Sequence, residues 1–203
     1  IGVRLVGSEM CIRDSIRDSI KGGTFNPYDK GFVSGNRNAA STLRRGIAGS
    51  VPHYQINDAK EACWAFEPTQ AVNYCEAHDN NTLWDKLCIS AKNDSEGVRI
   101  KMDKLAAAIV ILSQGMPFIQ LGQDFLRSKP RILKEGEAPN DVNIYSHDSY
   151  NAPDYTNSIK WNRKLEYKEV FEYYKALIRL RKGSPLFRMY TKEDAVSYTH
   201  LRA

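Results

Sequence analysis

Two short apolar runs, separated by one long helical segment, constrain the fold of this chain more than any other feature. Residues 70–77 and 117–121 read as buried strands because both are short and mostly apolar. Between them, residues 95–114 have helical spacing, and Gly115 and Pro117 end that helix. A strand, a helix and a second strand predict a parallel pair joined by a helical crossover, the unit of α/β folds.

Apolar spacing also predicts which helix faces are buried. The expected core face of the helix over 95–114 consists of Val98, Met102, Leu105, Ile109 and Leu112. Asn93 is its expected N-cap, with Glu96 completing a capping box. A second long helix is expected over 168–182, and its face consists of Val170, Tyr174, Leu177 and Arg181, widened by Phe171 and Ile178. We further expect a short helix over 41–48 and a long polar loop over 122–165.

Polar side chains follow both predicted strands. His78, Asp79 and Asn80 follow the first strand, and Gly122-Gln123-Asp124 follows the second. The carboxyl ends of parallel strands meet at one edge of a sheet, where α/β enzymes place their chemistry. One interpretation is therefore a functional rim. In the other, Asp79 or Asn80 only caps the helix that follows. Position alone leaves both open.

Both chain ends lack strand alternation and a sustained helical face. The strings VGSEMCIRDS and VSYTHLRA resemble translated sequencing-adapter sequence. We therefore leave residues 1–15, as an artefactual segment, and 196–203 out of fold reasoning. The remaining length fits one domain over 16–190, and we expect 191–203 to hold the start of a further domain and an artefactual tail.

Composition argues against several classes of partner. The net charge of +5 is spread along the chain without a basic block, which argues against a nucleic-acid footprint. No apolar run approaches the roughly 18 residues that a membrane span needs. Apart from Cys11 in the excluded end, the cysteines are Cys63, Cys75 and Cys88, whose spacing fits neither a metal site nor a disulfide framework. We expect free thiols, no metal site and a cytoplasmic protein.

Several linked motifs resemble the alpha-amylase superfamily, specifically its pullulanase and glycogen-debranching branch. The stretch NYCEAHDNNTLWDKL is similar to the motif after the seventh barrel strand of that branch. SQGMPFIQLGQDFLRSK is similar to the eighth strand, and DSYNAPDYTNSIKWN to the loop after it. VFEYYKALIRLRKGSPLFR is similar to the final barrel helix. The resemblance runs in order over most of residues 16–190.

The resemblance implies an α/β fold in which residues 16–190 form about the last quarter of a (β/α)8 TIM barrel, truncated before any C-terminal β-sandwich. The implied activity is retaining hydrolysis of α-1,6 branch bonds in α-glucans such as pullulan, glycogen and limit dextrins. In this family the nucleophile and the general acid follow strands four and five, which the resemblance places upstream of residue 16. No cofactor is implied for this part, and a structural Ca²⁺ elsewhere in the full protein stays open.

The same resemblance assigns the site residues. Asp79 corresponds to the third catalytic acid, which grips sugar hydroxyls at the cleavage point, and His78 to the histidine that bonds the same sugar. Asn80, in the same motif, is a further expected substrate contact. Trp84 is an expected pocket wall, with core packing as its alternative. Tyr150 and Asn151 are expected sugar contacts, and the alternative for both is that they only form an ordinary turn.

Two other function classes stay open. A glucan-binding relative could keep the barrel without the catalytic pair, and only residues upstream would distinguish it. A His-Asp metal phosphohydrolase would need further His and Asp ligands. The Gln123-Asp124 pair also departs from the family, which more often has Glu there, so a role for that pair is open.

Overall fold

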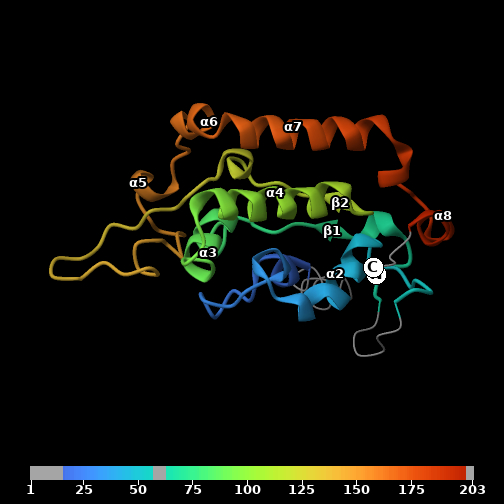
Figure 1. Ribbon diagram of the computed structural model, residues 1–203, viewed down its shortest axis with the longest axis horizontal. Helices are drawn as coiled ribbons and strands as arrows, with labels where there is room; N and C mark the ends of the chain where they lie inside the picture. Colours follow the sequence, from blue (N-terminus) through green and yellow to red (C-terminus); the bar gives the residue numbers. More distant parts are fainter. Residues whose placement is uncertain (1–15, 57–62, 200–203) are drawn as a thin grey trace.

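The predicted parallel strand pair forms the centre of the molecule. A computed structural model describes residues 16–56 and 63–199, and in it β1 (Val72–Asn73) pairs in parallel with β2 (Met116–Pro117). The amide of Phe118 donates to the carbonyl of Asn73 at 2.8 Å. Helices α3 (Leu83–Ser90) and α4 (Glu96–Leu112) form the crossover between the strands (Figure 1). The predicted strand–helix–strand order and parallel pairing are therefore confirmed.

Both strands are shorter than the apolar runs predicted. The runs over 70–77 and 117–121 give only two paired residues each, because each strand has a single hydrogen-bonded neighbour in the described residues. The second strand also begins one residue earlier than predicted, at Met116. The second run is also not buried as predicted, because Phe118 and Leu121 are 46% and 59% exposed. A strand is defined by its hydrogen-bonded ladder, so each strand ends where its neighbour turns away.

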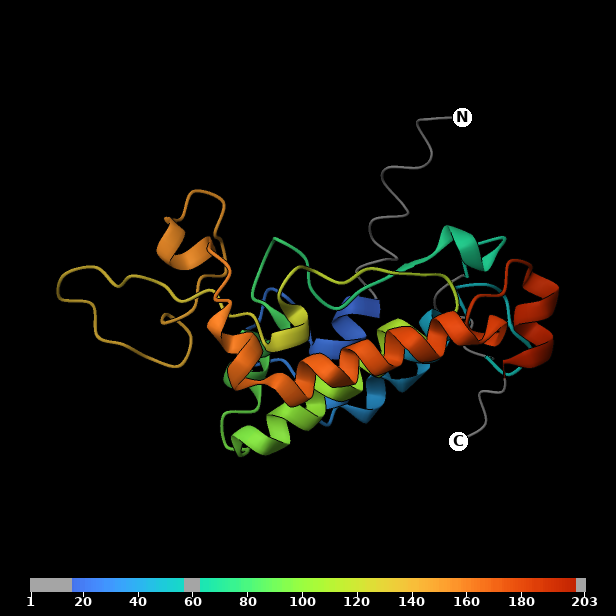
Figure 2. The same cartoon turned by 90° about the horizontal axis from the view of Figure 1, so that it is seen from above.

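Helix α4 lies between two core clusters. On one side, Ala106 and Val110 pack with a cluster that includes Ile20 from the helical segment 16–21. On the other side, Ala107 and Ile111 pack against α7 (Lys168–Gly183). Figures 1 and 2 show α7 lying along α4, with α2 on the opposite side of α4. This crossover helix is therefore the central element of the core.

Shorter elements connect these layers. The predicted helix over 41–48 is found as α2 (Ala40–Ile47). The predicted loop over 122–165 is mostly irregular, and residues between β2 and α5 project from the body in both views (Figures 1 and 2). The remaining short elements are η1 (Phe32–Ser34), η2 (Arg37–Ala39), η3 (Pro68–Gln70), η4 (Gln123–Phe125), α5 (Asp154–Asn157), α6 (Asn162–Glu166) and η5 (Pro185–Phe187).

The predicted core face of α4 is confirmed only in part, because Met102, Ile109 and Leu112 are partly buried against the two core clusters. Val98 and Leu105 are 38% and 42% exposed, and the buried positions are instead Asp103, Ala106, Ala107, Val110 and Ile111. Residues 105–112 are apolar on every side of the helix, so spacing does not select one face, and contacts on two sides decide the burial. The N-cap is Ser95, whose side chain accepts the amide of Val98, and not Asn93.

The predicted face of α7 is confirmed. Val170, Tyr174, Leu177 and Arg181 are its buried residues, whereas Ile178 is 37% exposed and does not widen that face. The Tyr174 hydroxyl donates to the Asp103 carboxylate at 3.1 Å, which joins α7 to α4 inside the core. Burial raises the pKa of Asp103 well above its usual range.

Helix α8 (Lys192–Tyr198) was not predicted. Its Ala195 is buried in a third cluster with Val51, Ala65 and Met189. The expected lack of pattern from residue 196 onward was thus wrong for residues 196–198, which are helical. The proposed artefactual segment 1–15 and the final residues 200–203 lie outside the described residues.

Arg181 fixes the turn between α4 and β2. Its guanidinium donates to the carbonyls of Ile111 (2.8 Å), Ser113 (2.7 Å) and Gly115 (2.5 Å). Those carbonyls have left the α4 hydrogen-bond pattern, so the arginine supplies partners that the helix end lacks. The amino end of β2 is therefore held by a side chain from α7.

Arg181→Met is expected to lower the free energy of unfolding by about 2 kcal/mol or more, because two buried carbonyls and one part-buried carbonyl lose charged donors. Urea denaturation measures this change. Arg179→Met, at an exposed position of the same helix, is the matched control and should change stability by less than about 0.5 kcal/mol. Equal losses in the two variants would contradict the assigned role of Arg181.

Candidate functional site

The segment after β1 places two polar side chains in the open. The side chains of His78 and Asp79 are 87% and 74% exposed, and the imidazole Nε2 lies 3.4 Å from a carboxylate oxygen of Asp79. Both residues line a cleft of about 270 Å³, whose other lining residues are Arg127, Ser149, Tyr150 and Asn157. An exposed carboxylate beside an imidazole in a cleft can accept hydrogen bonds from hydroxyl groups of a ligand.

The helix-cap alternative for this segment was wrong. Thr82 is the N-cap of α3, and its hydroxyl accepts the amide of Asp85 at 3.1 Å. Asn80 has a left-handed backbone (φ 61°), which is uncommon for a residue other than glycine. The Asp79 carboxylate is thus left free of a capping role.

Ionisable groups are buried directly beneath the exposed pair. The Glu76 carboxylate accepts the amide of Leu83 at 2.5 Å, and the Lys21 ammonium donates to the carbonyl of Asn81 at 3.0 Å. Both side chains are 1% exposed. Burial raises the pKa of Glu76 to about 7, opposed by the Leu83 amide and by Lys21, and burial lowers the pKa of Lys21 to about 8. The segment from 76 to 83 is therefore closed into a loop by hydrogen bonds from buried ionisable side chains.

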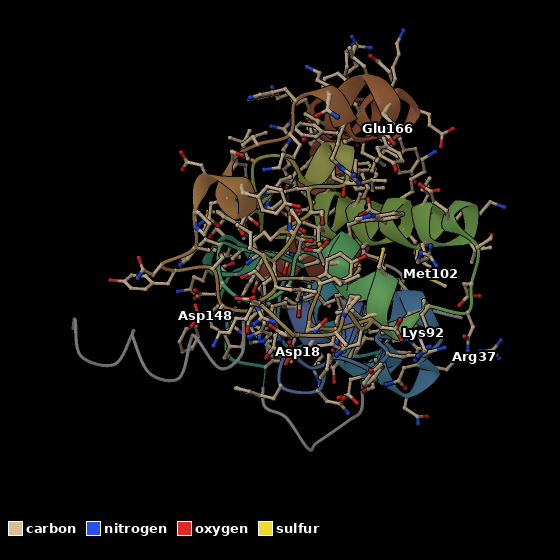
Figure 3. All side chains as sticks on the ribbon, turned by 90° about the vertical axis from the view of Figure 1, so that its left-hand side faces the viewer. Asp18, Arg37, Lys92, Met102, Asp148 and Glu166 are labelled. Carbon is tan, nitrogen blue, oxygen red and sulfur yellow. The ribbon has the colours of Figure 1, made fainter. Side chains whose placement is uncertain are left out.

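The segment over 148–153 contributes Ser149 and Tyr150 to the lining of the cleft. Tyr150 is 95% exposed and lines the cleft together with Asp79. Asn151 does not line this cleft; it lines a neighbouring hollow of about 520 Å³ to which Tyr150 also contributes. Figure 3 views the end of the molecule near α5 and labels Asp148, which lies on the same segment. The structure thus brings Tyr150, and not Asn151, to the His78–Asp79 pair.

Two other predicted site residues lie apart from the cleft lining. Trp84 is 7% exposed and packs in the cluster between α4 and α7, which is the core-packing alternative. The contribution of Asn80 is its backbone carbonyl, which accepts from the Lys129 ammonium. Neither side chain is among those that line the cleft.

The second strand does not deliver the predicted rim residues. Gln123 is 1% exposed, and its side-chain amide donates to Cys75 and Tyr174 inside the core. Asp124 is half-buried, burial raises its pKa, and it does not line the cleft. Gly122 has a left-handed backbone (φ 93°), and the turn it begins directs Gln123 inward.

Sequence reasoning missed the cationic residues that follow β2. Arg127 lines the cleft, and its guanidinium donates to the carbonyls of Leu121 (3.2 Å) and Asn157 (3.1 Å). Lys129 is 1% exposed and donates to the carbonyls of His78 and Asn80. The available signal was the pair of cations just beyond the predicted strand end, within the LRSK stretch.

Over residues 16–56 and 63–199, no three His, Cys, Asp or Glu side chains gather as metal ligands. In the same ranges, no helix has the length and apolar character needed to cross a membrane. The three described cysteines, Cys63, Cys75 and Cys88, are free thiols, as predicted.

Comparison with known proteins shows a consistent set of relatives. No family model matches the chain. The pullulanase of Bacillus subtilis strain 168 is 36% identical over 181 residues, which are 89% of this chain and 23% of that protein. Pullulanase A of Streptococcus pneumoniae strain D39 is 26% identical over 219 residues, covering 93% of this chain and 17% of that protein.

Solved structures agree with the sequence relatives. The pullulanase from Bacillus acidopullulyticus matches 91% of this chain with a TM-score of 0.76 and 37% identity, over 20% of its own chain. A mutant pullulanase from Paenibacillus barengoltzii, complexed with maltotetraose, matches with a TM-score of 0.78 and 36% identity, covering 91% of this chain and 26% of that one. The chain thus spans about a quarter or less of the relatives it matches.

The similarities first define a class: the chain is related to glycoside hydrolases of the alpha-amylase superfamily. Within that class it is a homologue of the pullulanases, over most of its own length. Both statements agree with the family resemblance found in the motifs around His78 and Gln123.

The buried carboxyl of Glu76 should make stability depend on pH. Between about pH 4.5 and about pH 7 the unfolded chain loses a proton that the folded chain keeps, so this group's contribution to stability falls as pH rises. Glu76→Gln removes this titration. Urea denaturation at several pH values measures the free energy of unfolding of both proteins. The value for the variant minus the value for the unsubstituted protein should therefore rise across this pH window. A difference that stays constant with pH would contradict the buried carboxyl.

Proposed function

We propose that residues 16–190 are about the last quarter of a (β/α)8 catalytic barrel in a pullulanase-type debranching glycosidase. The identity of 36% to a pullulanase over 89% of the chain supports this assignment, as does the partial coverage of pullulanase structures. The parallel β1–β2 pair with its helical crossover is the repeating unit of such a barrel. The proposed substrate is an α-glucan whose α-1,6 branch bonds are hydrolysed with retention.

The observation that carries the proposal is the position of Asp79. It lies in the segment that follows β1, exposed in a cleft, with His78 beside it and Tyr150 among the other lining residues. In a (β/α)8 enzyme this edge of the barrel holds the active site. Complexes of related pullulanases with maltose and with maltotetraose support an oligosaccharide ligand.

The proposed chemistry of Asp79 follows from its charge. A carboxylate accepts two strong hydrogen bonds from adjacent hydroxyls of one sugar ring. These bonds tighten as positive charge grows at the anomeric carbon in an oxocarbenium-like transition state. A fixed negative charge nearby also favours the protonated form of the general acid. His78, next to the carboxylate, binds the same ring. No cofactor is needed for this chemistry.

Residues that form and break the glycosidic bond are proposed to lie outside this chain, after barrel strands four and five. The 203-residue chain alone should therefore show no turnover of pullulan, whereas the full-length protein should release maltotriose units. Reducing-sugar assays on both proteins measure this difference. Turnover by the chain alone would contradict the assignment, and a full-length protein that binds pullulan without cleaving it would favour the glucan-binding alternative.

Asp79→Asn in the full-length protein is expected to lower kcat on pullulan by about a hundredfold or more, because the lost charge acts mainly in the transition state. Its stability should change little, since the side chain is 74% exposed. Asp194→Asn, an exposed aspartate on α8, is the matched control and should keep the unsubstituted kcat. Equal kcat values for both variants would reject the role of Asp79.

A further inference from the structure

One buried lysine joins the two segments that line the cleft. The Lys129 ammonium lies 3.1 Å from the carbonyl oxygen of His78 and 3.2 Å from the hydroxyl of Ser149, and it also donates to the carbonyl of Asn80. A lysine ammonium has three N–H donors, so these three acceptors use all of them. Two acceptors flank Asp79 in the sequence, and the third directly precedes Tyr150.

The position of this ammonium is set by the core. Asp85 on α3 is fully buried, and its carboxylate accepts the backbone amide of Lys129 at 2.8 Å and the hydroxyl of Ser128 at 2.5 Å. Helix α3 therefore holds the lysine backbone, while the lysine side chain holds the loop that precedes α3. One lysine thus joins the middle of the loop to the first turn of α3.

The contact to Asn80 has a specific conformational effect. Asn80 adopts a left-handed backbone, which returns the chain from the exposed Asp79 toward the buried Asn81 and Thr82. Asparagine adopts this conformation more readily than other non-glycine residues, and neighbouring groups can stabilise it further. A charged donor on the Asn80 carbonyl is such a group, because hydrogen bonds from ammonium ions are stronger than those between neutral groups.

We propose that Lys129 is a positioning residue that fixes the Asp79 carboxylate relative to Tyr150, so that both meet one sugar ring. This inference rests on the proposed function. Lys129 itself is buried and does not line the cleft, so it acts through the two segments it joins. A buried ammonium is retained only where each proton has an acceptor, which is the arrangement found here.

The test compares two buried cations in the full-length protein. Lys129→Met removes three hydrogen bonds at the carboxyl end of the strands, and Arg181→Met removes three at the amino end of β2. Both variants should lose stability. Only Lys129→Met should lower kcat on pullulan, by roughly a hundredfold, since small displacements of a reacting geometry have effects of that order.

Two further variants keep the test decisive. Lys129→Arg retains the charge and several donors, so it should recover most of the kcat lost in Lys129→Met. Lys129→Gln keeps two donors with a shorter reach and replaces the methionine variant if that protein does not fold. Its loss of kcat should be smaller than that of Lys129→Met and in the same direction.

Hydrogen exchange of the peptide over residues 77–82 gives a readout independent of substrate. It should become faster in Lys129→Met and stay unchanged in Arg181→Met, because only the first variant frees this loop. Unchanged exchange or unchanged kcat in Lys129→Met would overturn the positioning role. If the unsubstituted full-length protein neither binds nor cleaves pullulan, the proposed function itself fails. That outcome is distinguished from failure of the positioning role because it is measured without any substitution.

Discussion

The parallel pairing of β1 with β2 is the constraint on which the rest of the structure depends. It brings the carboxyl ends of two strands, more than 40 residues apart in the sequence, to one edge, where the segments after them share a cleft. The pairing requires a tight entry into β2. A Cβ at Gly115 would lie 2.7 Å from the carbonyl oxygen of Ala71, and its φ of 93° disfavours other residues. Arg181 then holds the carbonyls around this turn.

The exposed side chains of His78 and Asp79 belong to a loop whose backbone is bonded by buried ionisable groups. Glu76, Lys21, Asp85 and Lys129 are each 1% exposed or less, and each is hydrogen-bonded to backbone groups of the surrounding loops. Burying charged groups is unfavourable unless they are paired and bonded. Here these ionisable groups order the loop between β1 and α3 through hydrogen bonds to its backbone.

The sequence was informative where a pattern had a single solution. The face of α7 follows from its spacing, because polar residues separate the apolar ones. The face of α4 does not, because apolar residues surround the helix and two neighbouring layers decide which are buried. The segment His78–Asp79 was located from its place after a strand. Gln123 was misplaced because the left-handed turn at Gly122 sets the direction of the side chain. Lys129 is one of two cations just after the second predicted strand, but its partners could not be predicted from the sequence because they are mainly backbone carbonyls.

A crystal structure of the full-length protein with a bound maltooligosaccharide tests the central claim most directly. The predicted result is a glucose ring in the cleft beside Tyr150, with the Asp79 carboxylate about 2.5–3.0 Å from two adjacent hydroxyl oxygens. A ring bound in the barrel mouth that leaves the Asp79 carboxylate in solvent, or turned into ordinary packing, would contradict it.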